Sequence, residues 1–281
     1  MSRFKKSLFA LFCLILSLPE TAEAAKISVA VSIKPIHSLV AGIMAGVGEP
    51  SLIVKGSRSP HSYSLKPSDA RTLSHADVII WVGPGMELFL QKPISALAEH
   101  TRIVALSESI NGDPHLWLAP LRATSIVDRV LAALIEADPV HDTIYSNNAL
   151  SIKRKLKDLQ AYGIGKLTPV RKTPFLVFHD AWGRFAQSFS LSMTGAVALN
   201  PERPPGAKRI AIIRNLIEHD GIQCLFREPQ FDSPLLTTIL EDHLEMKVFE
   251  LDPLGSVLQP GPDLYFQMME NNINAVASCL R

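Results

Sequence analysis

The first half of the chain alternates short apolar runs with segments that have helical spacing. The apolar runs cover 27–33, 52–54, 78–82 and 103–106, and helical spacing appears at 36–46, 67–74 and 86–98. The run at 78–82 has no polar position, which is typical of a strand buried on both faces. Strands that alternate with helices predict a parallel sheet covered by helices on both sides.

The second half repeats this rhythm without repeating the sequence. Strands are predicted at 175–178, 223–226 and 247–251, and helices at 180–189, 207–219, 233–245 and 263–279. The two halves together predict an α/β protein of two lobes, each with a parallel sheet covered by helices.

The segment between the halves has a different pattern. From about His141 to Tyr162, apolar residues recur every three or four positions and charged residues occupy the other faces. Gly163 and Gly165 are expected to end this helix, and Pro169 to prevent its continuation. A helix of ~22 residues spans ~33 Å, long enough to join two lobes as one rigid element. The alternative is an ordinary surface helix within a single domain.

The N-terminus has the three parts of a secretory signal peptide. Basic residues at 3–6 precede an apolar run at 8–16, and Ala22-Glu23-Ala24 supplies small residues for cleavage. A buried N-terminal helix is the alternative. Cys13 lies before the cleavage point, so we expect an exported protein without a lipid anchor.

The expected organisation follows from these patterns. It consists of a signal peptide at 1–24, an N-terminal α/β lobe at 25–138, a linking helix at 139–168 and a C-terminal α/β lobe at 169–281.

Composition and charge narrow the class of protein. Hydrophobic residues make up 47% of the chain and charged residues 20%, as in globular proteins. Removal of residues 1–24 leaves 25 basic and 25 acidic residues. This balance argues against nucleic acid and anionic membranes as partners. We expect a monomer.

Two cysteines, Cys224 and Cys279, remain after the expected cleavage. An even number of cysteines in an exported chain makes a disulfide a candidate. Two free buried thiols are the alternative.

Three of the nine histidines follow predicted strands. His61 and His115 lie in loops beyond strands, His179 ends a strand, and Asp252 follows the last strand. Ligands of open α/β sheets bind beyond the carboxyl ends of the strands, and three imidazoles with one carboxylate suit zinc. The spacings form no local motif, so by position alone each histidine is equally well explained as an ordinary loop residue.

The sequence has none of the common local enzyme motifs. H-E-x-x-H, C-x-x-C, G-x-S-x-G, the P-loop and G-x-G-x-x-G are all absent. Enzyme classes with such local motifs therefore lose support, and we expect a protein that is not an enzyme; an enzyme with a dispersed site is the alternative.

Seven short motifs carry a resemblance to a known family. In chain order they are S-I-K-P (32–35), P-H-S-Y-S-L-K-P-S-D (60–69), W-V-G-P-G-M-E (81–87), H-L-W-L (115–118), F-H-D-A-W (178–182), E-P-Q-F (228–231) and L-D-P-L-G (251–255). On these motifs the chain resembles the periplasmic zinc-binding proteins of ABC importers, of the ZnuA type.

The resemblance implies two α/β lobes joined by one rigid helix, with Zn²⁺ bound between them by His61, His115 and His179. It also implies Asp252 as the fourth ligand, with water as the alternative, because Pro60 stands where some relatives have an acidic ligand. Manganese-binding relatives have Glu at the position of His179, so the histidine favours zinc.

Further expectations concern residues and partners around this site. The resemblance implies a disulfide between Cys224 and Cys279 in the C-terminal lobe. Glu228 is a candidate to orient a ligand imidazole, with a purely structural role as the alternative. The implied location is the periplasm, and the implied partners are a membrane permease with its ATPase, with loading by a periplasmic metallochaperone left open.

Three other functions stay open at this point. A manganese or iron carrier and an adhesin-like surface protein would share the fold. A secreted zinc hydrolase would use the same three histidines with an open position for water and a nearby general base.

Overall fold

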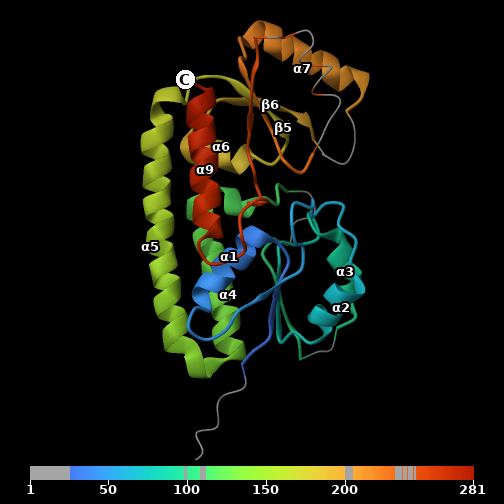
Figure 1. Ribbon diagram of the computed structural model, residues 1–281, viewed down its shortest axis with the longest axis vertical. Coiled ribbons are helices and arrows are strands. Elements are labelled where there is room, and N and C mark those ends of the chain that lie inside the picture. Colours follow the sequence, from blue (N-terminus) through green and yellow to red (C-terminus); the bar gives the residue numbers. More distant parts are fainter. Residues whose placement is uncertain are drawn as a thin grey trace, which may run out of the picture.

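The computed structural model describes residues 26–281 except 98–99, 108–111, 200–204, 232–235, 237–238, 240–242 and 244 (Figure 1). The expected signal peptide at 1–24 lies outside the described residues. The two α/β lobes that the sequence predicts are confirmed, and each is built on its own parallel sheet.

The N-terminal lobe has a four-stranded sheet with the strand order β2-β1-β3-β4. Its strands are β1 (Val29–Val31), β2 (Ser51–Leu52), β3 (Val78–Trp81) and β4 (Arg102–Ala105). All neighbours are parallel, and Val31 lies opposite Leu52 on one side and Ile80 on the other. The side chains of β3 are buried throughout, as its unbroken apolar run predicts.

Four helices accompany this sheet. They are α1 (Lys34–Ile43), α2 (Pro67–Ser74), α3 (Leu88–Ser95) and α4 (Pro120–Ala137). The sequence predicted three of them, but α4 was missed although its apolar residues recur at helical spacing. Pro120 starts α4 at a position where proline is favoured, because the first helical N–H has no partner within the helix.

The C-terminal lobe has a second four-stranded parallel sheet, in the order β6-β5-β7-β8. The strands are β5 (Phe175–His179), β6 (Met193–Ala198), β7 (Cys224–Arg227) and β8 (Lys247–Glu250), and the helices are α6 (Gly183–Phe189), α7 (Ala207–Asp220) and α9 (Leu264–Cys279). Strand β6 was not predicted. The helix predicted at 233–245 lies mostly outside the described residues.

The long helix α5 (Asp142–Leu167) runs along both lobes (Figure 1). It packs against α1 and α4 of the first lobe and against α6 and α9 of the second. The expectation that Gly163 ends it was wrong, since the helix continues to Leu167. Gly163 is instead a contact point, because a Cβ there would lie 2.3 Å from the ring of Phe189.

Besides the linking helix α5, a second segment of the chain connects the two lobes. After β8 the chain crosses to the N-terminal lobe, and α9 then returns beside α5 (Figure 1). The buried Lys34 ammonium donates to three backbone oxygens of this crossing, those of Gly255, Ser256 and Leu258. One cluster of buried apolar residues extends through both lobes, and a smaller cluster lies under α7.

Across the described residues, no helix combines the length and apolar character needed to cross a membrane.

The two cysteines form a disulfide, which confirms the predicted pair. Cys224 begins β7 and Cys279 ends α9, so the bond ties the last helix to the sheet over a sequence separation of 55 residues.

Reduction of this bond should destabilise the protein, because the unfolded chain regains the freedom of a long loop. We expect roughly 4 kcal/mol to be lost from the free energy of unfolding, measured by urea denaturation of the exported chain with and without dithiothreitol. The control is the variant Cys224→Ala/Cys279→Ala, which should already unfold at the lower urea concentration and should not respond to dithiothreitol. An unchanged midpoint for the fully reduced wild type would contradict the expectation.

Candidate metal centre

Three histidines from different segments meet between the lobes. His61 lies in the loop after β2, His115 follows β4 and directly precedes the short 3-10 helix η1 (Leu116–Leu118), and His179 is the last residue of β5. Each therefore lies at or beyond the carboxyl end of a parallel strand, where open α/β sheets bind ligands.

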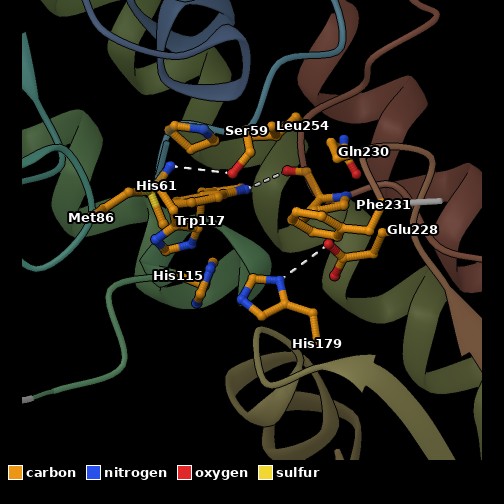
Figure 2. A pocket seen from close by; sticks show the side chains of 12 residues that line it. Ser59, His61, Met86, His115, Trp117, His179, Glu228, Gln230, Phe231 and Leu254 are labelled. Atoms are coloured by element: carbon orange, nitrogen blue, oxygen red, sulfur yellow. Dashed lines mark hydrogen bonds and ion pairs between the residues drawn. The ribbon is translucent and has the colours of Figure 1, made fainter. Parts of the chain in front are cut away.

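The three imidazoles form a compact group. Each offers one ring nitrogen, and these nitrogens all lie within 4.8 Å of one another. The ring centroids of His115 and His179 are 5.1 Å apart. The centroid of His61 lies 5.7 Å from that of His115 and 5.4 Å from that of His179. The rings line a pocket of about 10 Å³ (Figure 2). This space suits one ion or one water molecule, not an organic ligand.

The ring of His115 is fixed by an aspartate two residues before it. Asp113 Oδ1 lies 2.8 Å from His115 Nδ1 and also accepts the backbone N–H of His115 at 2.9 Å. Because a carboxylate only accepts, the Nδ1 proton points to Asp113, and Nε2 keeps a free lone pair for a metal.

His179 has an equivalent partner within the C-terminal lobe. Glu228 Oε2 lies 3.1 Å from His179 Nδ1, and Glu228 Oε1 accepts the indole N–H of Trp182 at 2.8 Å (Figure 2). Both oxygens of this buried carboxylate are thus engaged. The hydrogen bond gives Glu228 the position expected of a residue that orients a ligand imidazole.

In the described part of the chain no carboxylate is paired with His61, and the environment of the ring opposes its protonation. Among the described residues, its buried Nε2 has no hydrogen-bond partner. Burial, together with the neighbouring His115 and His179, lowers the pKa of His61 to about 3. Burial also lowers the pKa of His115, although Asp113 opposes the shift.

Apolar side chains enclose the group. Met86, Trp117 and Phe231 line the pocket beside the imidazoles (Figure 2). Trp117 is fully buried and donates its indole N–H to the backbone oxygen of Pro253 at 2.7 Å, which joins the two lobes next to the site. Limited access of water strengthens electrostatic interactions with a bound cation.

Asp252 does not join the three imidazoles in this structure, which differs from the expectation for the fourth ligand. The ligand atoms that lie within 4.8 Å of one another come from the three histidines, and no Asp252 oxygen is among them. It accepts hydrogen bonds from Gln230 Nε2, the backbone N–H of Leu254 and both the N–H and the hydroxyl of Ser256. These bonds shape the crossing that Lys34 holds, so Asp252 here organises a loop.

Sequence reasoning missed two residues close to the site. Asp113 was overlooked although the sequence Asp-Pro-His places it two residues before a candidate ligand. Arg184, on α6, lies with its Nε 3.2 Å from Asp113 Oδ2. No local signal pairs these two residues, because 71 positions separate them.

Comparison with known proteins agrees with this geometry. The family described as the periplasmic component A of the zinc-uptake complex, ZnuA, matches residues 29–279. The chain belongs to the ZnuA family. A relative named High-affinity zinc uptake system protein ZnuA, from Brucella abortus (strain 2308), is 37% identical over 305 residues and covers 90% of this chain and 91% of its own.

Solved structures show how widely this fold is shared. A crystal structure of ZnuA has a TM-score of 0.80 and 21% identity, covering 91% of this chain and 99% of its own. The solute-binding protein FpvC of Pseudomonas aeruginosa, in complex with Mn²⁺, also has a TM-score of 0.80, with 18% identity and coverage of 91% and 98%. The shared fold therefore does not decide which metal is bound. The donor atoms of the site decide it.

The lowered histidine pKa values predict a pH-dependent stability. The rings of His61 and His115 stay neutral in the folded protein, whereas in the unfolded chain they take up a proton below about pH 6.5. The unfolded state then binds more protons, so the free energy of unfolding of the metal-free protein should fall as the pH drops from about 6.5 towards 3. Urea denaturation across this range measures the slope.

His61→Gln should make this slope shallower, because the variant lacks one of the groups that protonate on unfolding. The matched control is His75→Gln, which changes an exposed histidine at the C-terminal end of α2. An equal slope for His61→Gln and His75→Gln would contradict the assigned shift.

Proposed function

We propose that this protein captures Zn²⁺ in the periplasm, holds it between its two lobes through His61, His115 and His179, and delivers it to an ABC-type permease. The observation that carries the proposal is the convergence of the three ring nitrogens within 4.8 Å. The zinc-uptake relatives support the transport role, and the ZnuA family description supports the periplasmic location.

The donor set favours zinc over manganese. Imidazole nitrogen suits zinc, while carboxylate and water oxygens suit manganese. The carboxylates of Asp113 and Glu228 each accept a hydrogen bond from Nδ1 of a histidine, which leaves Nε2 for the metal. Carboxylate–histidine pairs of this kind hold zinc ligands in a fixed orientation.

For the fourth position we propose water. The oxygens of Asp252 already accept several hydrogen bonds. Ligation by Asp252 would require the loop at 252–256 to give up these bonds.

A role in transport, not catalysis, fits the surroundings of the rings. A zinc hydrolase needs a general base beside the metal-bound water, and Asp113 and Glu228 are both committed to orienting imidazoles. Because α5, the crossing after β8 and α9 connect the lobes, we propose that small shifts release the ion to the permease and its ATPase.

The purified exported chain should contain one zinc per molecule and retain it against manganese. His115→Ala should weaken zinc binding by at least about 100-fold, because the variant lacks one of the proposed metal ligands. Loss of a carboxylate that only orients a ligand should cost less. Elemental mass spectrometry gives the metal content, and competition against a chelator gives the affinity.

His75→Ala is the matched control, since this histidine is exposed and does not belong to the group of three rings. Its affinity should equal that of the wild type. Preference for manganese in the wild type, or an unchanged affinity in His115→Ala, would contradict the proposal.

Asp252→Asn separates the two candidates for the fourth ligand. With water in the fourth position, zinc affinity should fall by less than about tenfold, while the free energy of unfolding falls by about 1–3 kcal/mol through lost loop hydrogen bonds. Chelator competition and urea denaturation measure the two effects. A loss of affinity as large as that of His115→Ala would identify Asp252 as a ligand.

A further inference from the structure

An arginine of the C-terminal lobe contacts the carboxylate that fixes a histidine of the N-terminal lobe. Arg184 Nε lies 3.2 Å from Asp113 Oδ2 and donates to the backbone oxygen of Asp113 at 3.0 Å. Its Nη2 donates to the same backbone oxygen at 2.5 Å. The guanidinium thus binds both the side chain and the main chain of one residue in the other lobe.

The two oxygens of Asp113 serve the two lobes separately. Oδ1 accepts from the backbone N–H and Nδ1 of His115, in the same lobe. Oδ2 faces Arg184, in the other lobe. The position of this carboxylate, and with it the ring of His115, therefore depends on how closely the lobes approach each other.

We propose that Arg184 is a positioning residue that couples closure of the lobes to zinc affinity through Asp113 and His115. With the lobes together, Arg184 holds Asp113 in place and His115 Nε2 points into the site. When the lobes separate, Asp113 loses its cross-lobe partner, His115 gains freedom and the ion leaves more readily. This inference rests on the proposed zinc-binding function.

Other contacts in the part of the chain that the structure describes do not make this connection. Lys34 and Trp117 also join the lobes, but their hydrogen bonds end on backbone oxygens of the crossing after β8. Glu228 holds His179 entirely within the C-terminal lobe. Helix α6, which carries Arg184, packs directly on η1, the element that begins after His115. Separation of α6 from η1 would therefore break the contact between Arg184 and Asp113 directly.

The ion pair between Arg184 and Asp113 is partly exposed, so we expect it to affect zinc affinity more than the stability of the fold. The side chains of Arg184 and Asp113 are 21% and 31% exposed. Ion pairs with such access to water contribute little to the stability of a fold. A loss of the pair should hence be visible in the metal site before it is visible in unfolding.

The test uses the exported chain with Arg184→Ala, Arg184→Lys, Asp113→Asn and the double variant Arg184→Ala/Asp113→Asn. Arg184→Ala should lower zinc affinity about 3- to 10-fold, mainly through faster dissociation to a chelator. Arg184→Lys should recover part of the loss, because it keeps the charge but lacks the fork that reaches both oxygens.

Asp113→Asn keeps an acceptor for His115 Nδ1 and removes the charge that attracts Arg184. If the two residues act as one unit, Arg184→Ala should cause a smaller loss in the Asp113→Asn background than in the wild type. Some loss should remain, because the asparagine keeps the backbone oxygen to which Arg184 donates. The visible absorption of the Co²⁺-loaded protein reports ligand geometry, and it should change in Arg184→Ala. Arg102→Ala, which breaks an exposed ion pair with Glu136 inside the N-terminal lobe, is the matched control and should leave affinity and spectrum unchanged.

Wild-type affinity and an unchanged Co²⁺ spectrum in Arg184→Ala would overturn the inference and leave the proposed function intact. Additive losses in the double variant would also overturn it, since they would show that the two residues act separately. A wild type that fails to bind zinc would contradict the proposed function itself.

Discussion

The structure depends on one arrangement: three imidazoles held together between two lobes, with little access to water. Burial and the neighbouring imidazoles lower the pKa of His61 and of His115. Nε2 of His61 is buried and has no hydrogen-bond partner among the described residues. A divalent cation bound between the rings would supply the partner that this nitrogen lacks.

The rest of the fold serves to place these rings. Parallel strands bring their carboxyl ends to one edge of each sheet, and the two edges face each other across the site. Helix α5, the crossing after β8 and α9 keep the lobes in register, and one apolar core runs through both. Two carboxylates then orient individual rings through hydrogen bonds to Nδ1. Asp113 holds the ring of His115, and Glu228 holds the ring of His179. Two lobes connected in this way suit the proposed release of the ion by small movements, not by wide opening.

Sequence reasoning reached the elements with strong local signals and missed those decided by distant contacts. The apolar run of β3 and the first-turn proline of α2 gave correct elements, because burial and φ restriction act locally. Gly163 misled, since its role is to admit the ring of Phe189, which lies far away in the sequence. The fourth ligand, predicted from the family resemblance as Asp252 with water as the alternative, stays a prediction; in this structure the Asp252 carboxylate accepts hydrogen bonds from Gln230 and Ser256. The pairing of Arg184 with Asp113 had no local signature at all.

The central claim is that three imidazoles from two lobes hold a single zinc ion. X-ray absorption at the zinc edge of the protein loaded with one equivalent tests it most directly. The account predicts three imidazole nitrogens and one oxygen at about 2.0–2.1 Å around the metal. A shell dominated by oxygen, or one with fewer than three imidazoles, would contradict the account.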